Sequence, residues 1–196
     1  LGPFLEKLCA LTRFEKALPM NTGAEAVETA LKAMRKWAYE VKGVPDGRAR
    51  IIAAANNFHG RTIAAISMST SDTTKKSFGP LLPGIDIVPF GDAAALEAAI
   101  TEDTAGVLLE PIQGEGGVVV PPDDYLARVR EICDKRSVLL CLDEIQTGLG
   151  RTGKMFCFEH YGIRPDIVTL GKALGGGVLP VSAVCAVRYT RFPTAM

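Results

Sequence analysis

The chain has 196 residues, and its 22 basic and 22 acidic side chains cancel to a formal net charge of zero. Hydrophobic residues make up 47% of it and charged residues 22%, a composition that indicates a folded domain and excludes a disordered segment. The length suits one sizeable domain. Without a basic excess we expect no nucleic-acid partner, and without an apolar run near the roughly 20 residues of a bilayer span we expect no membrane partner.

The five cysteines include no CxxC pair, and Cys141 and Cys185 lie within apolar runs. This pattern favours buried thiols in a reducing compartment over disulfides. His59 and His160 stand apart from other ligand-type residues, so we expect no metal site. The chain starts at Leu1 without an initiator Met, and we interpret it as part of a longer protein.

Helix and strand patterns alternate along the chain. A helix start is expected at residues 4–8, and the longest helix at residues 24–41, where apolar residues recur at i, i+4, i+7 and i+11. Thr22 and Glu25 fit a capping box at its start, and Gly43 follows its end. Further helices are expected at residues 61–68, 92–100 and 123–135. Apolar strands are expected at residues 50–55, 85–88, 105–109, 138–142, 167–170 and 181–184.

Continuous apolar strands are typical of a sheet that is buried on both faces. Their alternation with helices predicts a three-layer α/β fold, with a mainly parallel sheet and helices on both faces. In such folds the ligand binds beyond the carboxyl ends of the strands. The residues that directly follow the strands are therefore the candidates for function.

Two of these candidates carry charge next to buried strands. Asp143 ends an apolar run, where a partly buried carboxylate would hold a cationic ring nitrogen or a metal, or else cap a helix or form a structural ion pair. Lys172 lies between a strand and a glycine-rich turn. Desolvation there would lower its pKa and make it a nucleophile for aldehydes; the alternative is an exposed loop lysine.

Three further candidates have equally open readings. The backbone amides around Gly23 lie at the start of the long helix, where free amides can bind a phosphate. The alternative is that this segment only caps the helix. Phe58 is either a core residue or a flat lid on an aromatic ligand. Arg61 is either a solvated residue at a helix start or a residue whose planar guanidinium group binds a carboxylate.

One glycine motif points to a different class of protein. Residues 148–153 satisfy G-x-G-x-x-G, the dinucleotide-binding fingerprint. Five residues separate it from the preceding strand, and no convincing helix pattern follows it. A phosphate-binding P-loop at the same place fails because Met155 stands where Ser or Thr would hold magnesium. A dinucleotide-binding domain is kept as a remote alternative.

The chain resembles the class III pyridoxal-phosphate-dependent aminotransferases over roughly residues 4–187. Uncommon strings carry this resemblance and occur in the family's order: Asn21-Thr22-Gly23-Ala24-Glu25, Phe58-His59-Gly60-Arg61-Thr62, Glu110-Pro111-Ile112-Gln113-Gly114-Glu115, Asp143-Glu144-Ile145-Gln146-Thr147-Gly148 and Gly171-Lys172-Ala173-Leu174. The resemblance implies the large domain of the fold-type I transferases and pyridoxal 5'-phosphate as cofactor.

The resemblance also implies roles for residues of this chain. Lys172, Asp143 and Glu110 would be catalytic: the lysine holds the cofactor aldehyde and moves a proton, the aspartate pairs with the ring nitrogen, and the glutamate supports the ring. Arg61 would bind a substrate carboxylate, and Glu115 would neutralise a second carboxylate-binding arginine. The implied cofactor-binding residues are Thr22, Gly23, Ala24, Phe58, His59, Asp143, Gln146 and Lys172.

A finer likeness links the chain to family members that act on ornithine, and residues 18–23 and 177–184 carry it. It implies transfer of the δ-amino group of ornithine to a 2-oxo acid, 2-oxoglutarate, giving glutamate semialdehyde and glutamate. The alternatives are acetylornithine or another ω-amino acid as donor, or an inactive fragment. The implied assembly is a homodimer, in the cytoplasm or, for a eukaryotic source, in the mitochondrial matrix.

The resemblance finally predicts how the chain divides. Residues 1–187 are expected to form an incomplete cofactor-binding large domain, and residues 188–196 a tail that does not match the family. The family's small C-terminal domain and its N-terminal segment, which shape the substrate pocket, are expected to lie outside this sequence.

Overall fold

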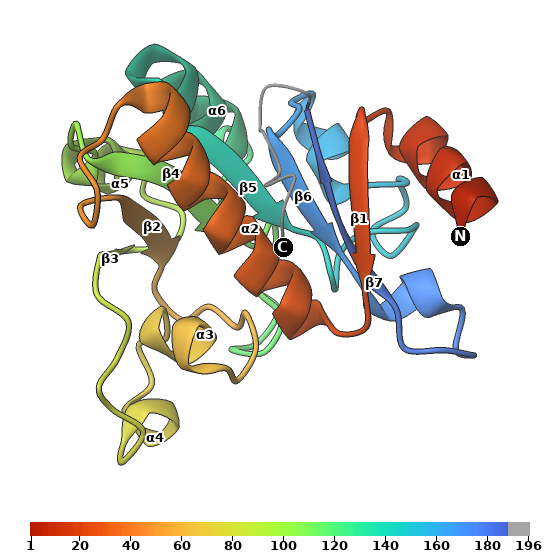
Figure 1. Ribbon diagram of the computed structural model, residues 1–196, viewed down its shortest axis with the longest axis horizontal. Coiled ribbons are helices and arrows are strands. Elements are labelled where there is room, and N and C mark those ends of the chain that lie inside the picture. Colours follow the sequence, from red (N-terminus) through yellow and green to blue (C-terminus); the bar gives the residue numbers. More distant parts are fainter. Residues whose placement is uncertain (188–196) are drawn as a thin grey trace.

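The computed structural model describes residues 1–187, and the predicted tail at residues 188–196 lies outside this range. Its centre is a seven-stranded sheet with the order β1-β7-β6-β5-β4-β2-β3 (Figure 1). The five strands from β3 to β6 in this order are parallel, while β7 runs antiparallel to both of its neighbours. The strands are β1 (Lys16–Met20), β2 (Arg50–Ala54), β3 (Ile85–Val88), β4 (Thr104–Leu109), β5 (Leu139–Asp143), β6 (Ile167–Leu170) and β7 (Ser182–Ala186).

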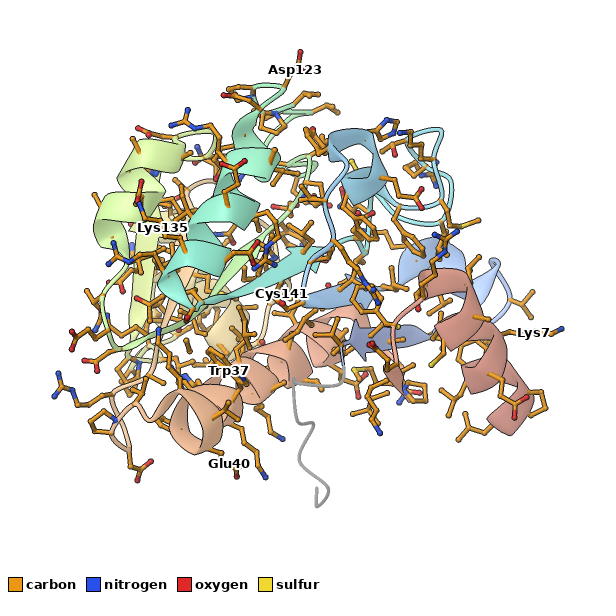
Figure 2. All side chains as sticks on the ribbon, turned by 90° about the horizontal axis from the view of Figure 1, so that it is seen from above. Lys7, Trp37, Glu40, Asp123, Lys135 and Cys141 are labelled. Carbon is orange, nitrogen blue, oxygen red and sulfur yellow. The ribbon has the colours of Figure 1, made fainter. Side chains whose placement is uncertain are left out.

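Helices cover both faces of the sheet, which confirms the predicted three-layer α/β fold. In Figure 2 the helix that carries Trp37 and the helix that carries Lys135 lie on opposite sides of the strand that carries Cys141. The α-helices are α1 (Gly2–Thr12), α2 (Gly23–Trp37), α3 (Ile63–Ser67), α4 (Asp72–Lys75), α5 (Ala93–Ala99) and α6 (Tyr125–Arg136).

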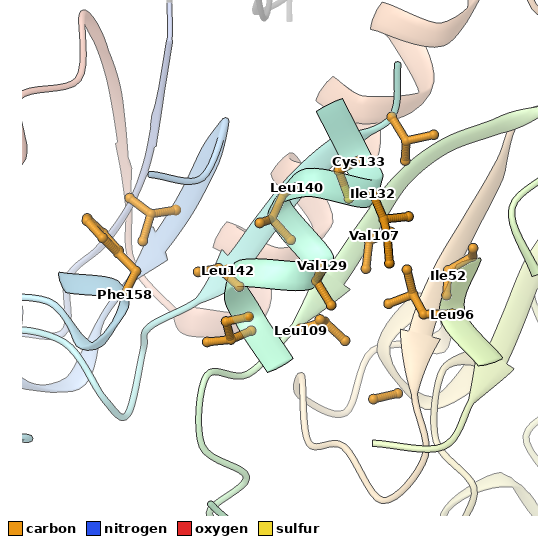
Figure 3. Close-up of a cluster of buried hydrophobic side chains, with 14 of the residues drawn as sticks. Ile52, Leu96, Val107, Leu109, Val129, Ile132, Cys133, Leu140, Leu142 and Phe158 are labelled. Carbon is orange, nitrogen blue, oxygen red and sulfur yellow. The ribbon is translucent and has the colours of Figure 1, made fainter. Parts of the chain in front are cut away.

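The core consists of two clusters because successive strand residues point to opposite faces. On β5, Leu140 and Leu142 pack toward α6, where they meet residues such as Val129 (Figure 3). Their neighbours Leu139 and Cys141 belong to the second cluster, on the side of α2. Every residue of β4, β5, β6 and β7 is buried, as the continuous apolar runs predict.

The long helix begins as predicted. The Glu25 amide donates to Thr22 Oγ1 at 3.2 Å, and the Thr22 amide donates to Glu25 Oε2 at 2.6 Å, so the capping box is confirmed. The helix continues as a π-helical turn, η1 (Ala38–Lys42), and ends at Gly43 with a left-handed φ of 83°. The N-terminus of α2 therefore has a fixed position at the edge of the sheet.

Three helices or strands differ from the sequence prediction, and one of them, α4, was not predicted. β1 was not predicted, because Pro19 interrupts its apolar pattern. Proline is tolerated there since β1 is an edge strand with only β7 as neighbour. The helix expected at residues 61–68 is shorter, α3, and its cap is Thr62, whose hydroxyl accepts from the Ala65 amide at 3.3 Å.

The cysteines are free thiols, and four of the five are buried. Burial raises the pKa of Cys133 and of Cys185 to about 12 and holds the pKa of Cys141 well above its usual value. These thiols are inert core residues. Among the helices of residues 1–187, none has the length and apolar character needed to cross a membrane.

Candidate active site

A pocket lies where the parallel strands end, as the fold predicts. Its cavity volume is about 230 Å³. The segments that follow β2, β4, β5 and β6 contribute to it together with the start of α2. The lining residues are Gly23, Ala24, Phe58, His59, Gly60, Glu110, Asp143, Ile145, Gln146 and Lys172.

Asp143 is the most constrained polar residue of the pocket. It is the last residue of β5 and only 4% exposed. Its Oδ1 accepts hydrogen bonds from the Thr169 hydroxyl at 3.0 Å and from the Ile145 amide at 3.2 Å, while its Oδ2 lies 2.7 Å from His59 Nδ1. Adjacent strands thus hold the carboxylate in one orientation.

His59 is buried beside Asp143, and only one of its ring nitrogens has a partner. Nδ1 bonds to Asp143, whereas Nε2 has no hydrogen-bond partner among the described residues. A buried polar atom without a partner is costly and marks a place where a ligand or water completes the site. His59 is thus connected to the pocket through Asp143.

Glu110 follows β4 and is also buried. Its Oε2 accepts from the Phe58 amide at 3.0 Å. Burial is the main cause that raises the pKa of Glu110 to about 7; the charge of His59 opposes this shift, and the charge of Asp143 adds to it within that value. A carboxyl with this pKa exchanges its proton near neutral pH, which is the range that proton-transfer catalysis needs.

The start of α2 forms one wall of the pocket. The amides of Gly23 and Ala24 have no acceptor within residues 1–187, so both are free to bind an anion. A Cβ on Gly23 would lie 2.9 Å from Ile145 Cδ1, and a Cβ on Gly60 would lie 3.1 Å from that of Ala24. The small residues at these positions therefore leave space beside the free amides, and we call this space the glycine cradle.

Gln146 lies on the opposite wall, above Gly114. A Cβ on Gly114 would fall 1.9 Å from Gln146 Oε1, so only glycine lets this amide occupy its position. Gln146 Nε2 donates to Glu115 Oε1 at 3.0 Å, which connects Glu115 to the pocket although Glu115 itself is exposed.

Lys172 begins the 3₁₀ turn η3 (Lys172–Gly175) directly after β6. Its φ is +41°, a left-handed conformation that is costly for a residue with a side chain. Of the two readings left open by the sequence, the structure shows the exposed one, although Lys172 also lines the pocket. Lys172 and the buried Asp143 thus line the same pocket.

The structure brings together most of the residues predicted for the site. Thr22 is adjacent to the pocket, and its hydroxyl is occupied by the capping box. Arg61 is exposed and does not line the pocket. Gly60 and Ile145 line it without having been predicted, although both lie within the family strings that contain predicted site residues.

Glu144 is a second buried acid that sequence analysis left without a role. Its carboxylate accepts from the amides of Cys157 and Phe158, both at 2.8 Å, and from the Thr147 hydroxyl at 3.1 Å. Burial raises its pKa to about 7. Glu144 thus holds the chain at Cys157 and Phe158, and it is not among the residues that line the pocket.

The glycine motif at residues 148–153 does not form a dinucleotide site. It runs through successive turns and leads into a short 3₁₀ turn, η2 (Cys157–Tyr161), rather than an α-helix. The helix N-terminus that would bind a pyrophosphate is therefore absent from this segment.

Fold and site together define an enzyme domain of the α/β class, with its pocket at the carboxyl ends of a mainly parallel sheet. The family model described as class III aminotransferase matches residues 1–190. The chain belongs to this family.

Known relatives agree with this assignment. The ornithine aminotransferase of Bacillus subtilis (strain 168) is 58% identical over 188 residues, which are 96% of this chain and 47% of the relative. The crystal structure of ornithine aminotransferase from Toxoplasma gondii ME49 superposes with a TM-score of 0.96 and 45% identity, over 100% of this chain and 47% of that one. A second structure of the Toxoplasma gondii enzyme, described with partial occupancy of pyridoxal phosphate at its active site, gives a TM-score of 0.95 and 47% identity over 96% of this chain and 45% of that one. The chain thus spans about half the length of these relatives.

Proposed function

We propose that this chain carries the cofactor-binding half of a pyridoxal-phosphate-dependent transaminase. The enzyme moves the δ-amino group of ornithine to 2-oxoglutarate and gives glutamate semialdehyde and glutamate. One observation carries the proposal: a lysine and a buried aspartate face one pocket from the ends of neighbouring strands, Lys172 after β6 and Asp143 at the end of β5. The likeness to ornithine aminotransferases supports the choice of donor.

The residues present fit pyridoxal phosphate. The free amides of Gly23 and Ala24 suit its phosphate, and the glycine cradle leaves room for it. The Asp143 carboxylate, held by three hydrogen bonds, suits a protonated ring nitrogen. Phe58 lines the same pocket and would stack on the ring.

Bound pyridoxal phosphate supplies an aldehyde that condenses with amines and a ring that accepts electrons. The chain's own residues orient it and move protons. Lys172 Nζ would hold the aldehyde of the cofactor, and its amine, once free, would accept the proton from the substrate carbon and return it. Asp143 keeps a negative charge beside the ring nitrogen, and Gln146 would bond the ring oxygen.

The substrate-binding roles stay predictions. Arg61 would bind a carboxylate, although it is exposed outside the pocket lining. Glu115, bonded to Gln146, would neutralise a second arginine that this chain does not supply at the pocket. Glu110 would support the ring from beneath, since its carboxylate holds the Phe58 amide.

The proposal extends to domain, assembly and location. Residues 1–187 would be the large cofactor-binding domain, and a second copy would cover the apolar residues near the site. Val118 and Val178 are both 82% exposed, and Leu179 is 70% exposed, which favours a homodimer. Free buried cysteines favour a reducing compartment, the cytoplasm.

The test is the visible absorption of the purified protein after incubation with pyridoxal phosphate and removal of the excess. We expect the band of lysine-bound cofactor in the parent and in Lys7→Ala, a lysine on α1 far from the site, and no band in Lys172→Ala. A full band in Lys172→Ala would contradict the assignment. Glutamate formation with ornithine at least about tenfold more efficient than with N-acetylornithine would then decide the donor.

A further inference from the structure

One polar side chain interrupts the apolar strand β6. Thr169 lies between Val168 and Leu170, and its exposed fraction is 0%. A hydroxyl group in an apolar interior is costly unless it has a hydrogen-bond partner. Within residues 1–187 the Thr169 hydroxyl donates only to Asp143 Oδ1, at 3.0 Å. The contact with Asp143 thus accounts for the presence of a hydroxyl group in this strand.

The register of the sheet brings the two residues together. Asp143 on β5 and Thr169 on β6 are partners in the parallel pairing of these strands. The Thr169 carbonyl also accepts from the Glu144 amide at 3.0 Å. The backbone and the side chain of Thr169 therefore hold the same two residues, at the point where β5 ends and the pocket begins.

The orientation of the Asp143 carboxylate depends on three donors. His59 Nδ1 lies 2.7 Å from Oδ2, while the Ile145 amide and the Thr169 hydroxyl donate to Oδ1. Ile145 follows Asp143 closely in the chain, so Thr169 is the donor that fixes Oδ1 to another strand. Partners on both oxygens keep the carboxylate plane from rotating. Without the Thr169 hydroxyl, Oδ1 would keep only the Ile145 amide, at 3.2 Å.

The strand that carries Thr169 also leads to the lysine of the pocket. β6 ends at Leu170, and Lys172 begins the turn that follows. Lys172 and Asp143 line the same pocket. The hydrogen bond from Thr169 to Asp143 therefore links the aspartate to the strand that positions the lysine.

We propose that Thr169 is a positioning residue, whose hydroxyl orients the Asp143 carboxylate toward the ring nitrogen of pyridoxal phosphate. The proposal rests on the proposed function, because it needs the cofactor in this pocket. Thr169 itself does not line the pocket, so its effect passes through Asp143. A carboxylate held in one orientation stabilises a proton on the ring nitrogen more than a carboxylate that rotates.

The test observes the ring nitrogen directly. The purified protein is loaded with pyridoxal phosphate labelled with ¹⁵N at the ring nitrogen, and NMR measures the pH at which this nitrogen loses its proton. Thr169→Val and Thr169→Ala remove the hydroxyl with and without the branched shape, and Thr169→Ser keeps the hydroxyl. The matched control is Thr104→Val, which changes another fully buried threonine, at the start of β4.

We expect the midpoint of this titration to fall by about one pH unit in Thr169→Val and Thr169→Ala, a tenfold change in proton binding. In Thr169→Ser and Thr104→Val it should stay within about 0.3 unit of the parent. Urea denaturation of the cofactor-free variants is measured in parallel. A purely structural role of Thr169 would lower the stability and leave the ring nitrogen unchanged.

A second arm shows whether Thr169 acts through Asp143. In the parent background we expect Thr169→Val to raise the Kd for pyridoxal phosphate about threefold to tenfold. In the Asp143→Asn background the charge is already lost, so adding Thr169→Val should change this Kd by less than about twofold.

An unchanged titration midpoint in Thr169→Val and Thr169→Ala overturns the proposal. So do a midpoint in Thr169→Ser as low as in Thr169→Val, and an equally large effect of Thr169→Val on Kd in the Asp143→Asn background. In each of these cases the parent still holds the cofactor, so the proposed function stands. A parent that takes up no pyridoxal phosphate contradicts both proposals.

Discussion

The amino and carboxyl ends of the strands carry the same kinds of charged residue, but these residues differ in whether they have partners within the chain. At the amino ends of the strands the charges pair: Arg130 donates to Asp166 at 2.8 Å, and Arg48 donates to Asp103 at 2.7 Å. At the carboxyl ends Asp143 lies 2.7 Å from His59 Nδ1, but His59 Nε2 has no hydrogen-bond partner among the described residues. Charges that are satisfied within the chain stabilise the fold, whereas charges left open are available to a ligand.

The strongest test exchanges one aspartate at each edge for asparagine. Asp143→Asn keeps a shape that can accept from Thr169 and Ile145 but removes the negative charge beside His59. We expect kcat to fall about 100- to 1,000-fold, since a fixed charge at the reacting group is lost. Steady-state transamination measures the effect.

The matched control is Asp166→Asn at the amino edge. Asp166 Oδ2 accepts from Arg130 and from the Leu140 amide, both at 2.8 Å. This change should cost about 1–2 kcal/mol of unfolding free energy and leave kcat within about twofold. A similar loss of kcat in both variants would contradict the claim that only the carboxyl edge of the sheet serves the chemistry.

The second test concerns Glu144, a buried acid near the site that serves the fold. Glu144→Ala leaves the amides of Cys157 and Phe158 without their acceptor. We expect a loss of about 3 kcal/mol in unfolding free energy, measured by urea denaturation, because two buried donors lose their partner. Unchanged stability with lost cofactor binding would instead place Glu144 in the chemistry.

The third test uses pH. In the folded protein burial raises the pKa of Glu110 to about 7, so the folded state binds the proton more tightly than the unfolded state. The carboxyl then favours folding below the unfolded pKa, and this contribution is lost as pH rises toward 7. Glu110→Gln removes the titration.

Relative to the parent, Glu110→Gln should therefore gain up to about 2 kcal/mol of unfolding free energy between pH 5 and pH 8 in the cofactor-free protein. Urea denaturation at several pH values measures this difference. Glu144, whose pKa is raised in the same direction, is present in both proteins and cancels. A stability difference that does not change with pH contradicts the raised pKa.

Most of the fold and much of the site follow from local sequence signals. The apolar runs fix six of the seven strands, and the capping box fixes the start of α2. β1 was not predicted because it contains a proline, which a strand tolerates only at the edge of a sheet. Whether a strand lies at an edge is a property of the whole sheet and not of the local sequence. The unpartnered Nε2 of His59 depends on three-dimensional packing, so the sequence alone did not reveal it.

The smallest expected effect concerns Arg50 and Asp86, which pair on β2 and β3 at the amino edge. The hydrogen bonds to Asp86 raise the pKa of Arg50. Because both side chains are partly exposed, solvent screens the pair, and a double-mutant cycle of Arg50→Ala and Asp86→Ala should give a coupling of at most about 1 kcal/mol. Salt near 1 M should reduce it further, while uptake of pyridoxal phosphate stays unchanged in all three variants. A coupling well above this value, or a change in cofactor uptake, would show that the amino edge communicates with the site rather than only stabilising the sheet.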